Sequence, residues 1–95
     1  MKTELVNITP AIARVMLQSN FDNRDLRPSR VELLRASFER GEYVMTHQGI
    51  AFDKSGNVCD GQHRLTAISM LPDNMVFPML VTKDMDRSKT FAVID

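Results

Sequence analysis

The chain has 95 residues and a formal net charge of zero, with 43% hydrophobic and 25% charged residues. This length and composition predict one soluble globular domain, residues 1–95, with a single modest core. Zero net charge gives the molecule no basic field to attract nucleic acid. The one cysteine, Cys59, excludes an internal disulfide and a thiolate metal cluster, and it fits a reducing cytoplasm. We find no signal peptide and no apolar run long enough for a membrane span, so we expect a cytoplasmic protein.

The first predicted elements are a short strand over residues 4–8 and a helix that follows it. Thr9 is a suitable N-cap, and Pro10 suits the first helical position because its missing N–H is not needed there. The helix is expected to end near Asn20. The side chains expected to face the core are Ile12, Val15, Met16 and Leu17.

The second helix has the clearest pattern in the chain. Ser29 with Glu32 three residues later predicts a capping box, and Gly41 predicts the C-terminal end. Arg35 and Glu39 have the spacing of an ion pair on the outer face, which favours a salt-bridged surface over a DNA-binding stripe. An apolar stripe with helical spacing faces the core: Val31, Leu34 and Phe38.

Two strand-like runs, residues 49–53 and 57–60, flank a glycine-containing turn and predict a β-hairpin. The chain then enters a helix that presents Leu65, Ile68 and Leu71 on one side. Residues 75–82 predict a further strand, and Pro78 within it indicates an edge position or a bulge.

A short extended segment at residues 43–45 and a last helix after Asp86 complete the predicted elements. The interleaved order predicts a small single-domain α/β (α+β) fold, with a short mixed sheet and about four helices.

The segment Asp60-Gly61-Gln62-His63-Arg64 joins a predicted strand to a predicted helix. A helix N-terminus presents backbone N–H groups and the positive end of the helix dipole. A glycine there allows a ligand to come close to the backbone, and His63 and Arg64 add side-chain donors. The pattern therefore favours a phosphate or another anion. The alternative is a helix cap with a solvated arginine and a histidine bonded to a backbone carbonyl.

At this segment the chain resembles the ParB/sulfiredoxin-like superfamily, in the ParB N-terminal-domain-like branch found in bacteriophages and mobile elements. The resemblance covers about residues 20–95 and is more specific for fold than for activity. The matching segments follow one another in the order of that branch: Asn23-Arg24, residues 38–43, residues 49–53, residues 60–65 and residues 91–95.

The resemblance implies a site for nucleotide phosphates, lined by Gly61, Gln62, His63 and Arg64, with Arg24 assisting from an earlier loop. It implies a nucleoside triphosphate, ATP or CTP with Mg²⁺, as the ligand. The residues themselves predict no metal site, because Asp53, Asp60 and Glu42 are spread along the sequence and do not form a cluster of carboxylates. DNA is a further partner that the resemblance implies. The neutral charge and the short chain also allow a host protein complex as the partner.

The departures from the family are also informative. Sulfiredoxin has its reactive cysteine immediately before the motif histidine, where this chain has Gln62, while Cys59 lies three residues earlier. ParB itself has an arginine pair in place of His63-Arg64, and it has further domains downstream. We expect binding more than covalent chemistry, in a chain that is either truncated or minimal relative to the family.

Three functions follow as hypotheses. The first is a nucleotide- or phosphate-binding module linked to DNA metabolism or regulation. The second is an interaction or inhibitor protein that docks on a host complex. The third is a phosphoryl-transfer or nuclease enzyme at the same cleft, for which Asp60 and Glu42 are weak catalytic candidates. For Asp60, capping of the following helix is the favoured alternative.

Overall fold

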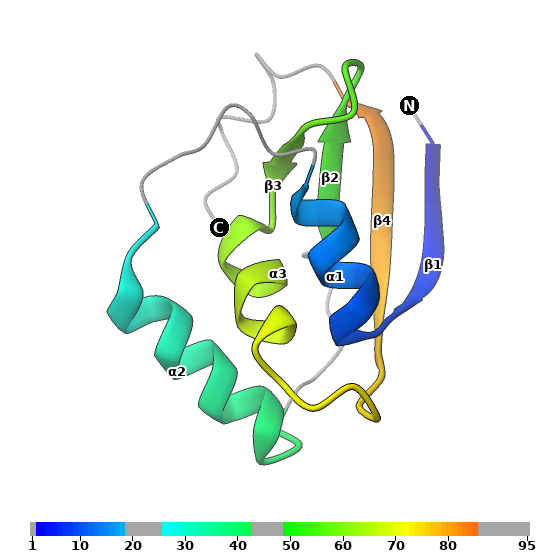
Figure 1. Ribbon diagram of the computed structural model, residues 1–95. Coiled ribbons are helices and arrows are strands. Elements are labelled where there is room, and N and C mark those ends of the chain that lie inside the picture. The colour runs from blue at the N-terminus through cyan, green and yellow to red at the C-terminus, as the bar shows by residue number, and fades with distance from the viewer. Residues whose placement is uncertain (1, 19–25, 43–48, 86–95) are drawn as a thin grey trace.

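The computed structural model describes residues 2–18, 26–42 and 49–85 of the chain. Within these ranges the chain forms four strands and three helices (Figure 1). The elements in chain order are β1 (Lys2–Ile8), α1 (Pro10–Leu17), α2 (Pro28–Glu39), β2 (Ile50–Asp53), β3 (Val58–Asp60), α3 (Gln62–Ser69) and β4 (Phe77–Met85). The α+β fold with a short mixed sheet is confirmed. Three helices are described where about four were expected.

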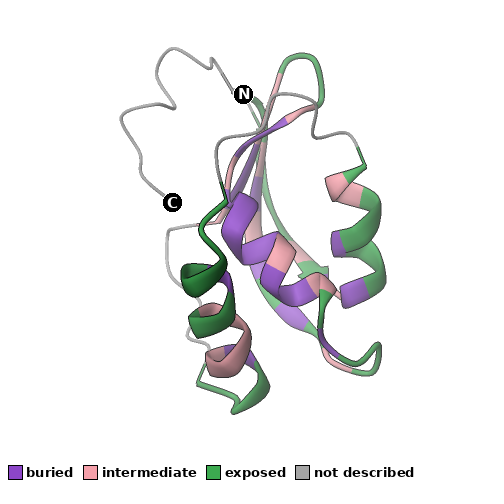
Figure 2. Ribbon diagram, turned by 60° about the vertical axis from the view of Figure 1, so that its left-hand side comes forward, coloured by how far each residue is buried: buried purple, intermediate pink, exposed green. Residues whose placement is uncertain are grey.

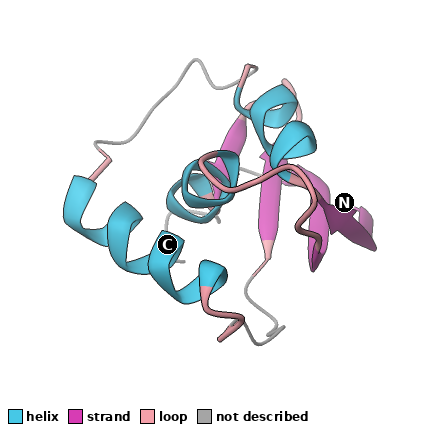
Figure 3. Cartoon of the chain, turned by 60° about the horizontal axis from the view of Figure 1, so that its bottom comes forward, coloured by secondary structure: helices cyan, strands magenta, loops and turns pink. Residues whose placement is uncertain are grey.

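The four strands form one mixed sheet in the order β1-β4-β2-β3. β4 pairs antiparallel with β1 and parallel with β2, and β2 pairs antiparallel with β3. Helices α1 and α3 lie over one face of this sheet, and α2 packs against α3 (Figures 1 and 3). The strand that begins the described chain and the strand that ends it are therefore neighbours.

The core lies between the sheet and the helices, where Figure 2 shows most of the buried segments. Side chains alternate across a strand, so that every second residue faces the helices. In β4 these residues are Phe77, Met79 and Val81, all at most 5% exposed. They join Leu65 and Ile68 of α3 in one apolar cluster. The predicted apolar side of the third helix is thus confirmed.

Helix α1 begins as predicted. Thr9 has extended backbone angles, and its Oγ1 accepts a hydrogen bond of 3.1 Å from the Ile12 amide. The prediction of its inner face was wrong in part, because Ile12 is 37% and Val15 62% exposed. Pro10 and Ala13 are the buried residues instead, so the inner face is rotated by about one residue.

Helix α2 begins two residues earlier than predicted, and it has no capping box. Pro28 takes the first helical position, which makes Arg27 the N-cap without a side-chain bond. Ser29 is therefore already inside the helix, and the Glu32 carboxylate bonds Arg35 instead, at 2.8 Å from Nε. Proline at the first helical position stabilises this start, since its fixed φ already suits the helix.

The C-terminal end of α2 agrees with the prediction. Gly41 has φ +74°, its amide bonds the Phe38 carbonyl at 3.1 Å, and the Glu42 amide bonds the Ser37 carbonyl at 3.0 Å. These two bonds are those of a Schellman motif. Val31 and Phe38 are buried and Leu34 is half-buried, so the predicted stripe is confirmed.

Ion pairs cover the outer face of α2. Arg35 lies 2.5 Å from Glu32 and 3.3 Å from Glu39, and Arg40 lies 2.9 Å from Glu42. The hydrogen bonds from the two arginines lower the pKa of the Glu32 and Glu42 carboxyl groups below their ordinary value. The predicted pairing of Arg35 with Glu39 is confirmed.

The predicted hairpin is present as β2 and β3. The Asp53 amide bonds the Asn57 carbonyl at 2.9 Å, and the Gly56 amide bonds the Asp53 carbonyl at 3.0 Å. Gly56 has φ +85°, the left-handed conformation that closes a three-residue hairpin loop. The Asp53 carboxylate accepts from the Ser55 and Asn57 amides and so fixes the turn.

The expectation of an edge position for Pro78 was wrong for the strand as a whole, because β4 lies between β1 and β2. Pro78 is opposite Asn7 of β1, whereas β2 pairs with β4 only from Val81 onward. The proline is thus placed where β4 has one partner strand, so its missing N–H interrupts no bond to β2.

The predicted extended segment at residues 43–45 and the predicted helix after Asp86 lie outside the described residues. No helix in the described part of the chain is long and apolar enough to cross a membrane.

Candidate functional site

The Asp60–Arg64 segment forms the sharp turn from β3 into α3. β3 ends at Asp60, Gly61 is the N-cap with φ +94°, and Gln62 opens the helix. A Cβ at Gly61 would overlap Cδ1 of Ile50 and lie 3.0 Å from the Gly49 carbonyl oxygen. Both the left-handed conformation and the lack of space explain why glycine is needed here.

The three polar residues that follow are all buried. Gln62 and His63 are each 7% exposed, and Arg64 is 8% exposed. Burial of polar and charged side chains costs free energy unless each is hydrogen-bonded. The first turn of α3 is therefore the most polar part of an otherwise apolar core.

His63 connects α3 to the beginning of α2. Its Nε2 accepts a hydrogen bond of 3.1 Å from the backbone amide of Arg27, 36 residues earlier in the sequence. An accepting Nε2 carries no proton, so the neutral imidazole has its proton on Nδ1. The contact fixes both the tautomer and the orientation of the ring. The alternative hypothesis expected a bond from the histidine to a backbone carbonyl, whereas this bond is accepted from a backbone amide.

Arg64 connects α3 to β2 and β3. Its Nη2 donates to the Gly49 carbonyl oxygen, one residue before β2 begins. The same nitrogen lies 3.9 Å from Oδ1 of Asp60, and both side chains are nearly buried. The guanidinium carries five N–H donors in a rigid fork, which allows it to bond the protein and a ligand at the same time.

The structure brings Asp60 together with the predicted motif residues, but it places Glu42 elsewhere. Glu42 lies just past the C-terminal end of α2, whereas His63 contacts Arg27 at the opposite end. Twelve helical residues separate these ends by about 18 Å. Arg24 lies outside the described residues.

The described part of the chain has no group of three or more His, Cys, Asp or Glu side chains that could hold a metal ion. The chemistry of the motif is therefore that of a buried guanidinium and imidazole beside a single carboxylate. Such a set can bind and orient an anion through charge-assisted hydrogen bonds.

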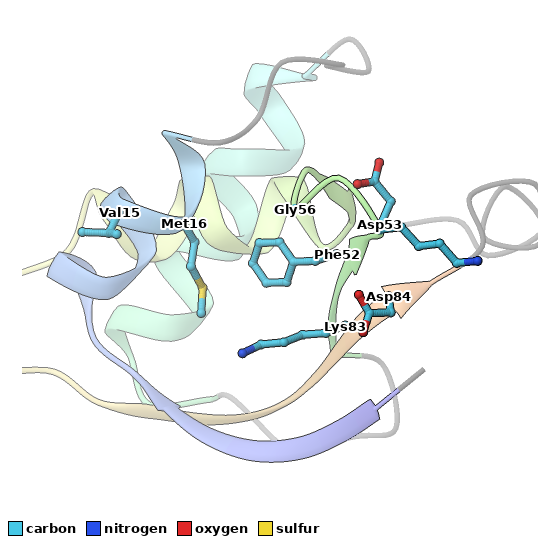
Figure 4. Close-up of a pocket in the computed structure, with 8 residues that line it drawn as sticks. Val15, Met16, Phe52, Asp53, Gly56, Lys83 and Asp84 are labelled. Carbon is cyan, nitrogen blue, oxygen red and sulfur yellow. The ribbon is translucent and has the colours of Figure 1, made fainter.

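A pocket of about 370 Å³ lies between the C-terminal half of α1, the β2–β3 hairpin and the end of β4. Figure 4 shows Phe52 and Met16 extending into it, with the Lys83 side chain running below them. This volume is at the lower end of the range for small-molecule sites. The lining residues are Val15, Met16, Phe52, Asp53, Lys54, Gly56, Lys83 and Asp84.

This pocket was not predicted from the sequence. Val15 was expected to face the core, but it is 62% exposed and lines the pocket rim instead. Asp84 has φ +59°, an uncommon backbone conformation for a residue other than glycine. Only a shift of the predicted inner face of α1 by one residue would have placed Val15 outside the core.

The chain matches no protein-family model, no curated protein and no solved structure. The resemblance to the ParB/sulfiredoxin-like superfamily consequently stays a prediction that rests on the motif residues.

Proposed function

We propose that the protein is a binding module for a phosphate-bearing ligand, of the nucleotide class, at the Asp60–Arg64 turn. The observation that carries the proposal is the burial of Gln62, His63 and Arg64 in one helical turn directly after a left-handed glycine. Apolar side chains would fill this space at a lower cost in free energy. Three hydrogen-bonding side chains stand here in place of apolar ones, which supports a role for them in binding a ligand.

The contacts of these side chains support a preorganised site. The Arg27 amide holds His63, and the Gly49 carbonyl and Asp60 hold Arg64. Side chains fixed in this way lose little conformational entropy when an anion binds. The positive end of the α3 dipole adds to the attraction for a negative ligand.

The phosphate part of the ligand follows from the chemistry of Arg64. A guanidinium fork matches phosphate geometry through two parallel N–H···O bonds, which an ammonium group does not. The nucleoside part follows only from the family resemblance. ATP and CTP, each with Mg²⁺, are therefore the first ligands to test.

The experiment is calorimetric titration of the protein with ATP, CTP, GTP, their diphosphates and pyrophosphate, with and without Mg²⁺. We expect saturable binding of at least one of them. Arg64→Lys keeps the charge but loses the fork, so it should weaken binding roughly 10-fold or more.

Arg30→Lys is the matched control, because Arg30 is an exposed arginine on α2, and it should bind as the wild type does. Circular dichroism checks that each variant is folded. Absence of binding to every ligand would overturn the proposal, as would equal affinities for Arg64→Lys and wild type. In either case the buried side chains would serve only to join α3 to Arg27 and Gly49.

A further inference from the structure

Strand β1 forms one edge of the sheet. Among the described strands its only neighbour is β4, and Figure 1 shows it on the outer side of that strand. Its pairing with β4 runs without interruption from Lys2 opposite Lys83 to Ile8 opposite Phe77. The strand contains no proline and no bulge, which are two of the usual devices that prevent an edge from pairing with another strand.

The sheet face directed away from the helices carries a short apolar pair at this edge. Leu5 of β1 lies opposite Leu80 of β4, and Leu5 is 58% exposed while Leu80 is half-buried. On one side of this pair, the Thr3 and Thr82 hydroxyl groups bond each other at 2.9 Å. Leu5 is thus a large apolar side chain near the middle of an open edge.

We propose that a second copy of this chain binds at this edge, with its own β1 antiparallel to the first and a two-fold axis at Leu5. Two-fold symmetry requires the same surface on both partners. With the axis at Leu5, all seven residues of β1 overlap, because Lys2 then lies opposite Ile8 of the second copy. The four described strands of each copy join into one continuous sheet.

The side-chain pattern of β1 favours this register over its neighbours. Leu5 packs against Leu5 of the second copy, and the two Leu80 side chains extend the row to four leucines across four strands. An axis at Glu4 would place two carboxylates directly opposite each other, which is destabilising. An axis at Val6 would place Leu5 opposite Asn7 and leave Lys2 and Thr3 without a partner.

Charge on the helix-facing side is compatible with the same register. Glu4 lies opposite Val6 of the second copy, and the Lys83 ammonium of its own chain stands 3.8 Å from its carboxylate. The interface consists mainly of one strand, so it is small, and we expect a dimer that dissociates on dilution. This inference does not depend on the proposed ligand site.

The experiment is sedimentation equilibrium over a wide range of protein concentration, with wild type, Leu5→Lys and Leu5→Glu. The wild type should form dimers as the concentration rises. Each variant alone should dimerise roughly 10-fold or more weakly, because like charges meet at the axis. An equimolar mixture of the two variants should recover a one-to-one heterodimer, since opposite charges then face each other.

Leu33→Lys is the control, because Leu33 is 71% exposed on α2, away from β1, and its dimer should equal that of the wild type. A wild type that stays monomeric throughout would overturn the proposal. Dimers that persist unchanged in Leu5→Lys would place the interface elsewhere and overturn it too. A mixture of Leu5→Lys and Leu5→Glu that stays monomeric would rule out the register through Leu5.

Discussion

Gly61 shows at the scale of one residue how backbone geometry positions the candidate site. Its φ of +94° turns the chain from β3 into α3 within a single residue. The space where a Cβ would stand is filled by Ile50 and the Gly49 carbonyl. The same carbonyl accepts the hydrogen bond from Arg64, so the turn and the buried arginine depend on one arrangement of β2.

We predict that Gly61→Ala destabilises the protein by about 2–4 kcal/mol. The left-handed conformation costs an alanine about 1–2 kcal/mol, and the overlap with Ile50 adds a cost of overpacking. Urea unfolding followed by circular dichroism measures the change.

Gly56→Ala provides the matched control. Gly56 has φ +85°, and a Cβ there would meet no atom within 4 Å. It should therefore lose only the conformational part, about 1 kcal/mol. Equal losses in the two variants would show that crowding at Gly61 has no energetic effect.

At this scale the sequence predicted which residues form the turn from β3 into α3 but not their contacts. Asp60 through Arg64 were identified because glycine, histidine and arginine at a strand–helix junction form a local pattern. The bond from the Arg27 amide to His63 joins residues 36 apart, and the bond from Arg64 to Gly49 joins residues 15 apart. Such partners depend on how α2 and β2 pack, which no local pattern contains.

The helices show at the scale of elements how proline decides between two possible N-caps. Thr9 and Arg27 each precede a proline, and in both cases the proline takes the first helical position. Thr9 can use its hydroxyl as a cap there, whereas Ser29 follows Pro28 and is already helical. The residue before the proline is thus the N-cap in both helices.

The two helix starts should therefore respond differently to alanine. Thr9→Ala should destabilise the protein by about 1 kcal/mol, because the Ile12 amide loses its side-chain acceptor. Ser29→Ala should change stability by less than about 0.5 kcal/mol, as expected for an exposed residue that forms no cap. Thermal unfolding of both variants is the measurement. A larger loss of stability in Ser29→Ala than in Thr9→Ala would support the capping box of Ser29 and Glu32 and contradict this prediction.

The predicted inner face of α1 was wrong in part, because residue size as well as hydrophobicity decides which side of a helix packs closely. Met16 and Leu17 pack against the core as predicted, but Ile12 and Val15 are exposed, and the smaller Pro10 and Ala13 are the buried residues. α1 packs against α3, and a small residue allows two helices to come close. Hydrophobic periodicity predicts the existence and length of a helix more reliably than it predicts which face is buried. The reason is that the largest apolar residues are not always those that fit closest to a neighbouring helix.

At the scale of the whole molecule, β4 is the strand that joins β1 to the rest of the sheet. It is the last described element, yet it lies between β1, the first, and β2. Its helix-facing residues contact the same core as α3. Because segments distant in the sequence meet on this strand, the sheet order could not be read from the sequence, although the individual strands were predicted.

Met79 tests this role of β4. It is 1% exposed in the middle of the strand, so Met79→Ala would leave a cavity that costs about 2–5 kcal/mol. If the described elements unfold as one cooperative unit, amide hydrogen exchange should accelerate by the same factor in β1, β2 and α3. Met70 is 57% exposed at the end of α3, and Met70→Ala should change exchange little.

Faster exchange confined to β4 and β1 would instead show that the hairpin and α3 form a separately stable unit. In that case the candidate site would remain folded without β1, and dimer formation through Leu5 and ligand binding through Arg64 would be energetically independent.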